Sequence, residues 1–200
     1  IREIFSRLNQ GAVALSDQEI RHAIYPGALD SLLAELAQDP EIARFGLSES
    51  GQSVKDALEP EEQVLRYFAF SEDKDLAGFS STLKDFLDNF MEENASIDGE
   101  KVDEFRNRFK SALARCLKVF GDDVFVNPSA EKKRKGLVHY DLVMTTVGEL
   151  DDAVIDKYDA DIKKAYASLC DSDGFKKTLS GGLQDKSRVV KRRAQWREVL

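Results

Sequence analysis

The chain has 200 residues, 42% of them hydrophobic, and a formal net charge of −8. This composition is close to ordinary globular usage, which excludes a largely disordered chain and allows one substantial core or two small ones. No apolar run approaches the ~20 residues needed to span a bilayer, so no membrane segment is predicted. Cys116 and Cys170 fall on the apolar sides of helical patterns, which predicts buried, reduced thiols and a cytoplasmic location.

Apolar residues recur at helical spacing along most of the chain, and the breaks between these stretches contain proline, glycine or polar turn residues. Helices are expected at residues 16–25, 28–37, 60–70, 81–94, 98–120, 137–150, 151–169 and 185–200, with short helical turns at 39–45 and 172–179. Residues 46–59 and 121–135 lack this period and are expected to be irregular. The predicted fold class is therefore all-α, a multi-helix bundle with at most a short strand at the N-terminus.

The apolar faces of these expected helices identify a candidate core. Nine side chains are predicted to be buried there: Leu33, Leu65, Phe68, Phe86, Phe90, Phe109, Leu113, Leu142 and Ile162. In the segment 151–169 the apolar stripe includes Val154, Tyr158 and Tyr166. Trp196 lies on the apolar stripe of the last helix, so it is expected to anchor that helix.

The most specific stretch of the sequence is 4–25. Within it, Ser16 and Glu19 have the spacing of a capping box, in which each side chain accepts a hydrogen bond from the backbone amide of the other residue. The remaining polar or special residues around the turn before this helix are Arg7, Asn9, Gly11 and Arg21. Free amides and the helix dipole favour an anion at such a helix N-terminus.

The same stretch carries a resemblance to a known family. Its matching residues are Phe5, Arg7, Leu8, Asn9, Gly11, Leu15, Glu19 and Arg21. Together they resemble the second signature of the GmrSD-type restriction endonuclease N-terminal family, a branch of the ParB-like nuclease fold. Weaker resemblances follow at residues 60–70, 83–91 and 175–196. We expect residues 1–27 to hold this signature and the first helix, and residues 28–200 to form the helical bundle of one domain truncated at its N-terminus.

The resemblance implies a nucleotide or DNA-phosphate pocket. Five residues are predicted to bind nucleotide or phosphate: Arg7, Asn9, Gly11, Glu19 and Arg21. Arg7 would offer a forked cation and Asn9 a contact to phosphate or to the shell of a metal ion. The alternative is structural: Asn9 satisfies turn amides, Arg7 pairs with a carboxylate, and Glu19 only caps the helix.

Family members also carry an upstream Asp-Gly-Gln-Gln-Arg motif, which the resemblance assigns to nucleotide or phosphodiester chemistry. This sequence lacks that motif. We therefore expect the chain alone to be inactive and to hold no cofactor, with its partner half in a missing N-terminal module. The intact protein would restrict foreign phage DNA through nucleotide hydrolysis or the sensing of modified DNA, using a nucleoside triphosphate and Mg²⁺. The alternative function is a non-enzymatic helical protein-interaction module.

The C-terminal segment is strongly basic. Residues 176–197 contain eight of the 29 basic residues of the chain and one of its 37 acidic residues. Four arginines near Trp196 are candidates for contact with nucleic acid or with the missing module: Arg188, Arg192, Arg193 and Arg197. The alternative is a solvated face around one buried indole. Both interpretations place these arginines at the surface.

The sequence predicts no metal site. His22, His139, Cys116 and Cys170 are scattered, and their separations match no zinc-binding pattern. Each lone histidine is typical of a surface or hydrogen-bonded structural residue rather than of a general base. The catalytic residues remain unassigned.

Overall fold

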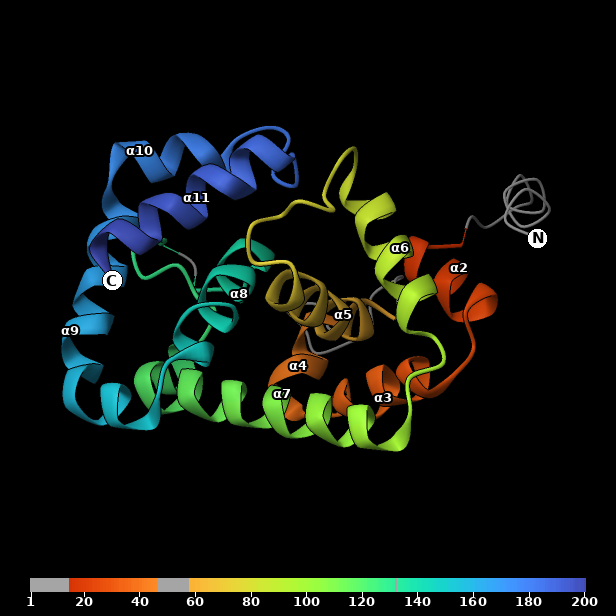
Figure 1. Cartoon of the computed structure of the whole chain (residues 1–200). Helices are drawn as coiled ribbons and strands as arrows, with labels where there is room; N and C mark the ends of the chain where they lie inside the picture. Colours follow the sequence, from red (N-terminus) through yellow and green to blue (C-terminus); the bar gives the residue numbers. More distant parts are fainter. Residues whose placement is uncertain (1–14, 47–57, 132) are drawn as a thin grey trace. The chain divides into compact units, whose positions relative to one another are not determined.

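The computed structural model describes residues 15–46, 58–131 and 133–200 (Figure 1). Of these residues, 73% are helical. No strand forms among them, and Val126 and Lys135 make one isolated β-bridge. The predicted all-α class is confirmed. The strand expected at the N-terminus and most of the loop expected at 46–59 lie outside the described residues.

The contacts divide the chain into two compact units. Unit 1 consists of residues 1–69 and 84–106, and unit 2 consists of residues 70–83 and 107–200. Two of the three boundaries fall within α5 (Glu59–Glu72) and α7 (Gly99–Phe120), and the third directly follows Leu83. The division expected at residue 27 rests on the family signature alone and stays a prediction.

Unit 1 contains α2 (Asp17–Ile24), α3 (Ala28–Leu36), α4 (Pro40–Ala43) and α6 (Leu83–Asn94), together with the first parts of α5 and α7. Its core includes Leu33, Leu65 and a stacked pair of rings, Phe68 and Phe105, with centroids 4.6 Å apart. Gly27 joins α2 to α3 beside the backbone of Ala95, and a Cβ at Gly27 would lie 2.1 Å from the Ala95 carbonyl oxygen. A side chain at residue 27 would therefore separate α3 from the turn after α6.

Unit 2 contains the ends of α5 and α7, followed by α8 (Leu137–Met144), α9 (Asp152–Asp171), α10 (Asp173–Lys176) and α11 (Lys186–Val199). Helix α11 packs against α8 and α9 (Figure 1). Trp196 of α11 is fully buried, and its ring meets the edge of Tyr166 at a centroid distance of 5.3 Å. Its indole N–H donates to the Thr146 hydroxyl, which satisfies the polar end of the ring.

All nine side chains predicted to form the core are buried. Trp196 is also buried, as expected. Most of the expected helices match observed ones to within a few residues, because their apolar stripes face the cores of the two units. Two segments differ from expectation, and each has a local cause.

The single helix expected at 137–150 is wrong at its C-terminal end, because α8 ends at Met144. The hydroxyls of Thr145 and Thr146 donate to the carbonyl oxygens of Asp141 and Leu142, one turn back. A 3-10 turn at Val147–Glu149 follows. This ending is consistent with the tendency of threonine to compete for helical carbonyl groups.

Helix α9 is interrupted at Tyr158, whose backbone angles are φ −126° and ψ 16°. The interruption rotates the apolar stripe, so Tyr158 is 42% exposed although the helical period predicts that it faces the core. Tyr166, two turns later, is buried as expected.

Candidate functional site

The five residues predicted to bind phosphate divide into two groups. Arg7, Asn9 and Gly11 lie outside the described residues. Glu19 and Arg21 lie on α2 and can be placed. The structure therefore places two of the five residues predicted to bind phosphate.

Glu19 completes the capping box of α2. Its carboxylate accepts from the Ser16 amide at 2.7 Å, and the Ser16 hydroxyl accepts from the Glu19 amide at 3.2 Å. This part of the prediction is confirmed. Because the cap already uses these two amides, a phosphate that needed them would have to displace the cap.

Arg21 is buried, with 2% of its surface exposed. Its Nε donates to Asp88 at 2.8 Å, and its Nη1 donates to Glu62 at 3.0 Å and to Gln18 at 2.9 Å. Asp88 also accepts from Lys84 at 2.7 Å. The guanidinium group thus ties α2 to α5 and α6, and its charge is offset by carboxylates. Direct contact between Arg21 and phosphate stays a prediction.

The structure also brings together three residues that the sequence does not connect. His22 of α2, Asp30 of α3 and Glu61 of α5 have ligand atoms that all lie within 4.8 Å of one another. Nδ1 of His22 is 3.0 Å from Oδ1 of Asp30. Asp30 and Glu61 are buried, whereas His22 is exposed on the outer side of the cluster.

The surroundings of Glu61 disfavour the charged form of its carboxylate. Burial raises the pKa of Glu61, the charge of Asp30 raises it further, and His22 partly lowers it. The only sequence signal would have been the proximity of His22 and Asp30 across the Pro26–Gly27 turn. Glu61 is 31 residues beyond Asp30, and only the packing of α5 brings it into the cluster.

The arginines of α11 are more buried than expected. Arg192 donates to the carbonyl oxygens of Thr178 and Leu183, while Arg193 donates to the Phe70 carbonyl at 3.3 Å. The Arg193 guanidinium also lies over the Phe70 ring, 5.8 Å from its centroid. All of these groups belong to unit 2. Both interpretations of the sequence placed Arg192 and Arg193 at the surface. The structure shows instead that both side chains are buried.

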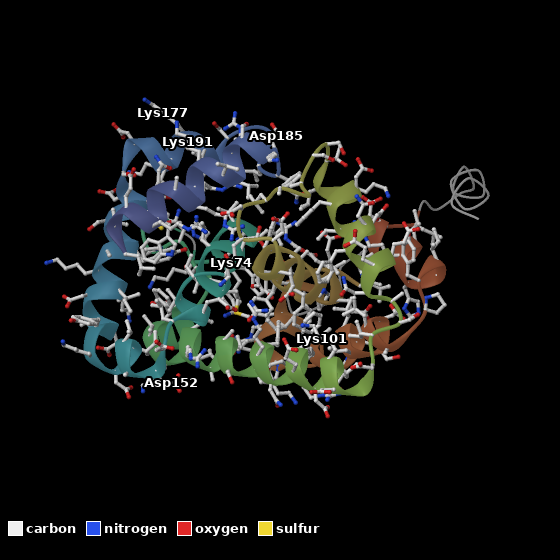
Figure 2. The ribbon with its side chains drawn as sticks, in the orientation of Figure 1. Lys74, Lys101, Asp152, Lys177, Asp185 and Lys191 are labelled. Atoms are coloured by element: carbon white, nitrogen blue, oxygen red, sulfur yellow. The ribbon has the colours of Figure 1, made fainter. Side chains whose placement is uncertain are left out.

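The remaining cations of this segment differ in their accessibility. Arg197 is exposed, and Arg188 is half-buried and donates to the Lys177 carbonyl at 3.0 Å. Lys177 and Lys191, which are labelled in Figure 2, are exposed. Contact with a polyanion or with an acidic protein surface would therefore involve Arg197 and these lysines before Arg192 or Arg193.

Neither His139 nor the cysteines form a reactive site. His139 is buried against the Tyr166 hydroxyl, and burial lowers its pKa to about 4, with a smaller effect from the charge of Arg192. Both cysteines are buried free thiols, as predicted. Burial raises the pKa of Cys170 to about 12 and raises that of Cys116 as well. The thiolate form needed for nucleophilic chemistry is thus suppressed at both positions.

Comparisons with family models, with curated proteins and with solved structures gave no match to this chain. The GmrSD-type resemblance therefore rests on the signature residues themselves. Over residues 15–46, 58–131 and 133–200, no helix combines the length and apolarity needed to cross a bilayer.

Proposed function

We propose that this chain is the helical part of a GmrSD-like, ParB-fold restriction protein. In this proposal the segment before α2 forms one wall of a pocket for a nucleotide or for DNA phosphate. A separate N-terminal module supplies the other wall. The intact protein would act in the cytoplasm on foreign DNA, with a nucleoside triphosphate and Mg²⁺ bound between the two parts.

The observation that carries this proposal is the anchoring of α2. Its N-terminus is fixed by the box between Ser16 and Glu19, and its body is fixed by the ion pairs of Arg21 with Asp88 and Glu62. Helix α2 is therefore held both at its N-terminus and along its body. Such restraint favours electrostatic stabilisation of phosphate, because fixed donors need no reorganisation when the ligand binds.

The signature residues then fall into two roles. Arg7, Asn9 and Gly11 would contact the phosphates, with Arg7 supplying the cation. Glu19 and Arg21 would act as positioning residues, because their side chains are already engaged within unit 1. This assignment refines the prediction that all five residues contact phosphate.

The test is the binding of a labelled nucleoside triphosphate to the intact protein in the presence of Mg²⁺. Asn9→Ala and Arg7→Ala should each weaken binding at least about tenfold, which corresponds to about 1.4 kcal/mol. Arg44→Ala is a matched control, because Arg44 is exposed and pairs with Glu41 in its own turn. Unchanged binding in both Asn9→Ala and Arg7→Ala would refute the proposal.

A second function, a non-enzymatic helical interaction module, is favoured by one observation. Glu19 and Arg21 both have structural roles that need no ligand. The same experiment separates the two functions. If the intact protein fails to bind any nucleoside triphosphate, the interaction module becomes the better explanation.

A further inference from the structure

The cluster of His22, Asp30 and Glu61 in unit 1 brings together three potential metal ligands from three helices. One imidazole and two carboxylates have their ligand atoms within 4.8 Å of one another. The helices that carry them, α2, α3 and α5, all belong to unit 1. None of the cluster's members is among the five residues predicted to bind nucleotide or phosphate.

Glu61 is the part of this cluster that protein contacts leave unsatisfied. It is 9% exposed, and its Oε2 atom is enclosed with no hydrogen-bond partner among the residues that the structure describes. A buried carboxylate oxygen in this state carries the full cost of its lost hydration. The neighbouring Asp30 is also buried and adds like-charge repulsion. A cation placed between the two carboxylates would relieve both effects.

We propose that His22, Asp30 and Glu61 bind a divalent first-row transition-metal ion, with Zn²⁺ and Mn²⁺ as the chemical candidates. An imidazole ligand suits Zn²⁺ better than Ca²⁺ or Mg²⁺, which take oxygen ligands, and the two carboxylates also suit Mn²⁺. The two carboxylates would together match the charge of the ion. Three protein ligands leave a fourth coordination position open. Because His22 is exposed, this open position would face solvent.

The geometry requires a small adjustment on binding. Neighbouring ligand atoms of a tetrahedral zinc site are about 3.3 Å apart, given metal–ligand distances of about 2.0–2.1 Å. The His22–Asp30 pair is already at 3.0 Å. The remaining separations, of up to 4.8 Å, can close if the Glu61 side chain rotates, and its Oε2 has no hydrogen-bond partner among the described residues.

A proton is the competing occupant of the cluster. A protonated Glu61 would remove the same repulsion without a metal. The two occupants differ in what they predict. A proton site would show no saturable metal binding, whereas a metal site would bind one ion and lose affinity when a ligand is removed.

The experiment is a calorimetric titration of the metal-free 200-residue protein with ZnCl₂ and, separately, with MnCl₂ at pH 7.5. At least one of the two ions should bind at one equivalent. Glu61→Gln and His22→Gln should each weaken this binding at least about tenfold. Glu93→Gln is the matched control, because Glu93 is an exposed carboxylate on α6 of the same unit, and it should bind as the wild type does.

A thermal melt provides a second readout that does not depend on the titration. Without metal, Glu61→Gln should melt at the same temperature as the wild type or higher, because it removes a buried, repelled charge. With the ion that binds, the melting temperature of the wild type should rise, while that of Glu61→Gln should stay the same. Wild-type affinity in both ligand variants would overturn the proposal, as would the absence of saturable binding of either ion.

Discussion

At the scale of single residues, His139 gives the chain a defined sensitivity to acid. Its pKa is lowered to about 4 in the folded protein, mainly by burial, against an ordinary value of about 6.5. Between these values the unfolded chain binds a proton that the folded chain does not. Stability should therefore fall as the pH drops from about 6.5 to about 4, by up to about 3 kcal/mol.

This prediction can be checked by urea unfolding at pH 7 and at pH 4.5, followed by circular dichroism. His139→Gln should lose less stability between these two pH values than the wild type. The carboxylates titrate in both proteins, so the difference between the two losses isolates the histidine. Equal losses in the wild type and the variant would contradict the assignment.

Arg21 is a second residue whose environment has a measurable consequence. Arg21→Met should cost about 3 kcal/mol of stability, because it leaves the buried Asp88 without its guanidinium partner. Asp88 keeps Lys84 as a partner, so the double variant Arg21→Met, Asp88→Asn should recover part of the loss. The exposed Arg44→Met should change stability by no more than about 0.5 kcal/mol. Similar effects of Arg21→Met and Arg44→Met in a urea titration would count against the buried pair.

At the scale of elements, α11 is held by an aromatic anchor and by buried arginines. Trp196→Ala should cost about 3–5 kcal/mol, because it removes a fully buried indole. Arg193→Ala should also destabilise, by about 1–3 kcal/mol, since it removes the hydrogen bond to Phe70 and buried packing. Arg197→Ala, at an exposed position of the same helix, should be close to neutral. A melt in which Arg193→Ala behaves as Arg197→Ala does would show that the burial of Arg193 contributes nothing.

The sequence predicted features that depend on local spacing and missed those that depend on tertiary packing. The Ser16–Glu19 box needs only a three-residue separation, and the core positions need only the helical period. The burial of Arg192 and Arg193 could not be predicted in this way, because their partners are carbonyl groups of Thr178, Leu183 and Phe70. Because arginine side chains are ordinarily exposed, the residue type alone predicted a surface position for both.

The same reasoning explains the errors within elements. The apolar content of 137–150 predicted a longer helix than α8, because hydropathy does not register the hydroxyl bonds of Thr145 and Thr146. The cluster of His22, Asp30 and Glu61 was missed for a related reason. Its members come from three helices, and no fixed spacing encodes how α5 packs against α2 and α3.

At the scale of the whole molecule, the proposal of a divided pocket makes a negative prediction. The purified 200-residue chain should neither hydrolyse a nucleoside triphosphate nor cut DNA. Phosphoryl transfer depends on positioning and on charge stabilisation from several directions. Arg7 and Asn9 would supply one wall, and the Asp-Gly-Gln-Gln-Arg motif that would supply the other is absent from this sequence.

The assay combines phosphate release from the four nucleoside triphosphates with Mg²⁺ and the cleavage of plain and modified plasmid. No signal above a buffer blank is expected in either arm. Turnover that disappears on Asn9→Ala or Arg7→Ala would show that these 200 residues contain a complete site. The prediction of a divided pocket would then be wrong.

The position of Trp196 also makes the chain its own spectroscopic reporter. It is the single tryptophan of the sequence, it belongs to unit 2, and its ring is fully enclosed. Its fluorescence should therefore shift to longer wavelength when unit 2 unfolds, whereas far-ultraviolet circular dichroism follows the helices of both units. Since coincident transitions by different probes are the signature of two-state unfolding, the two midpoints measure, without any added label, whether unit 1 and unit 2 melt cooperatively.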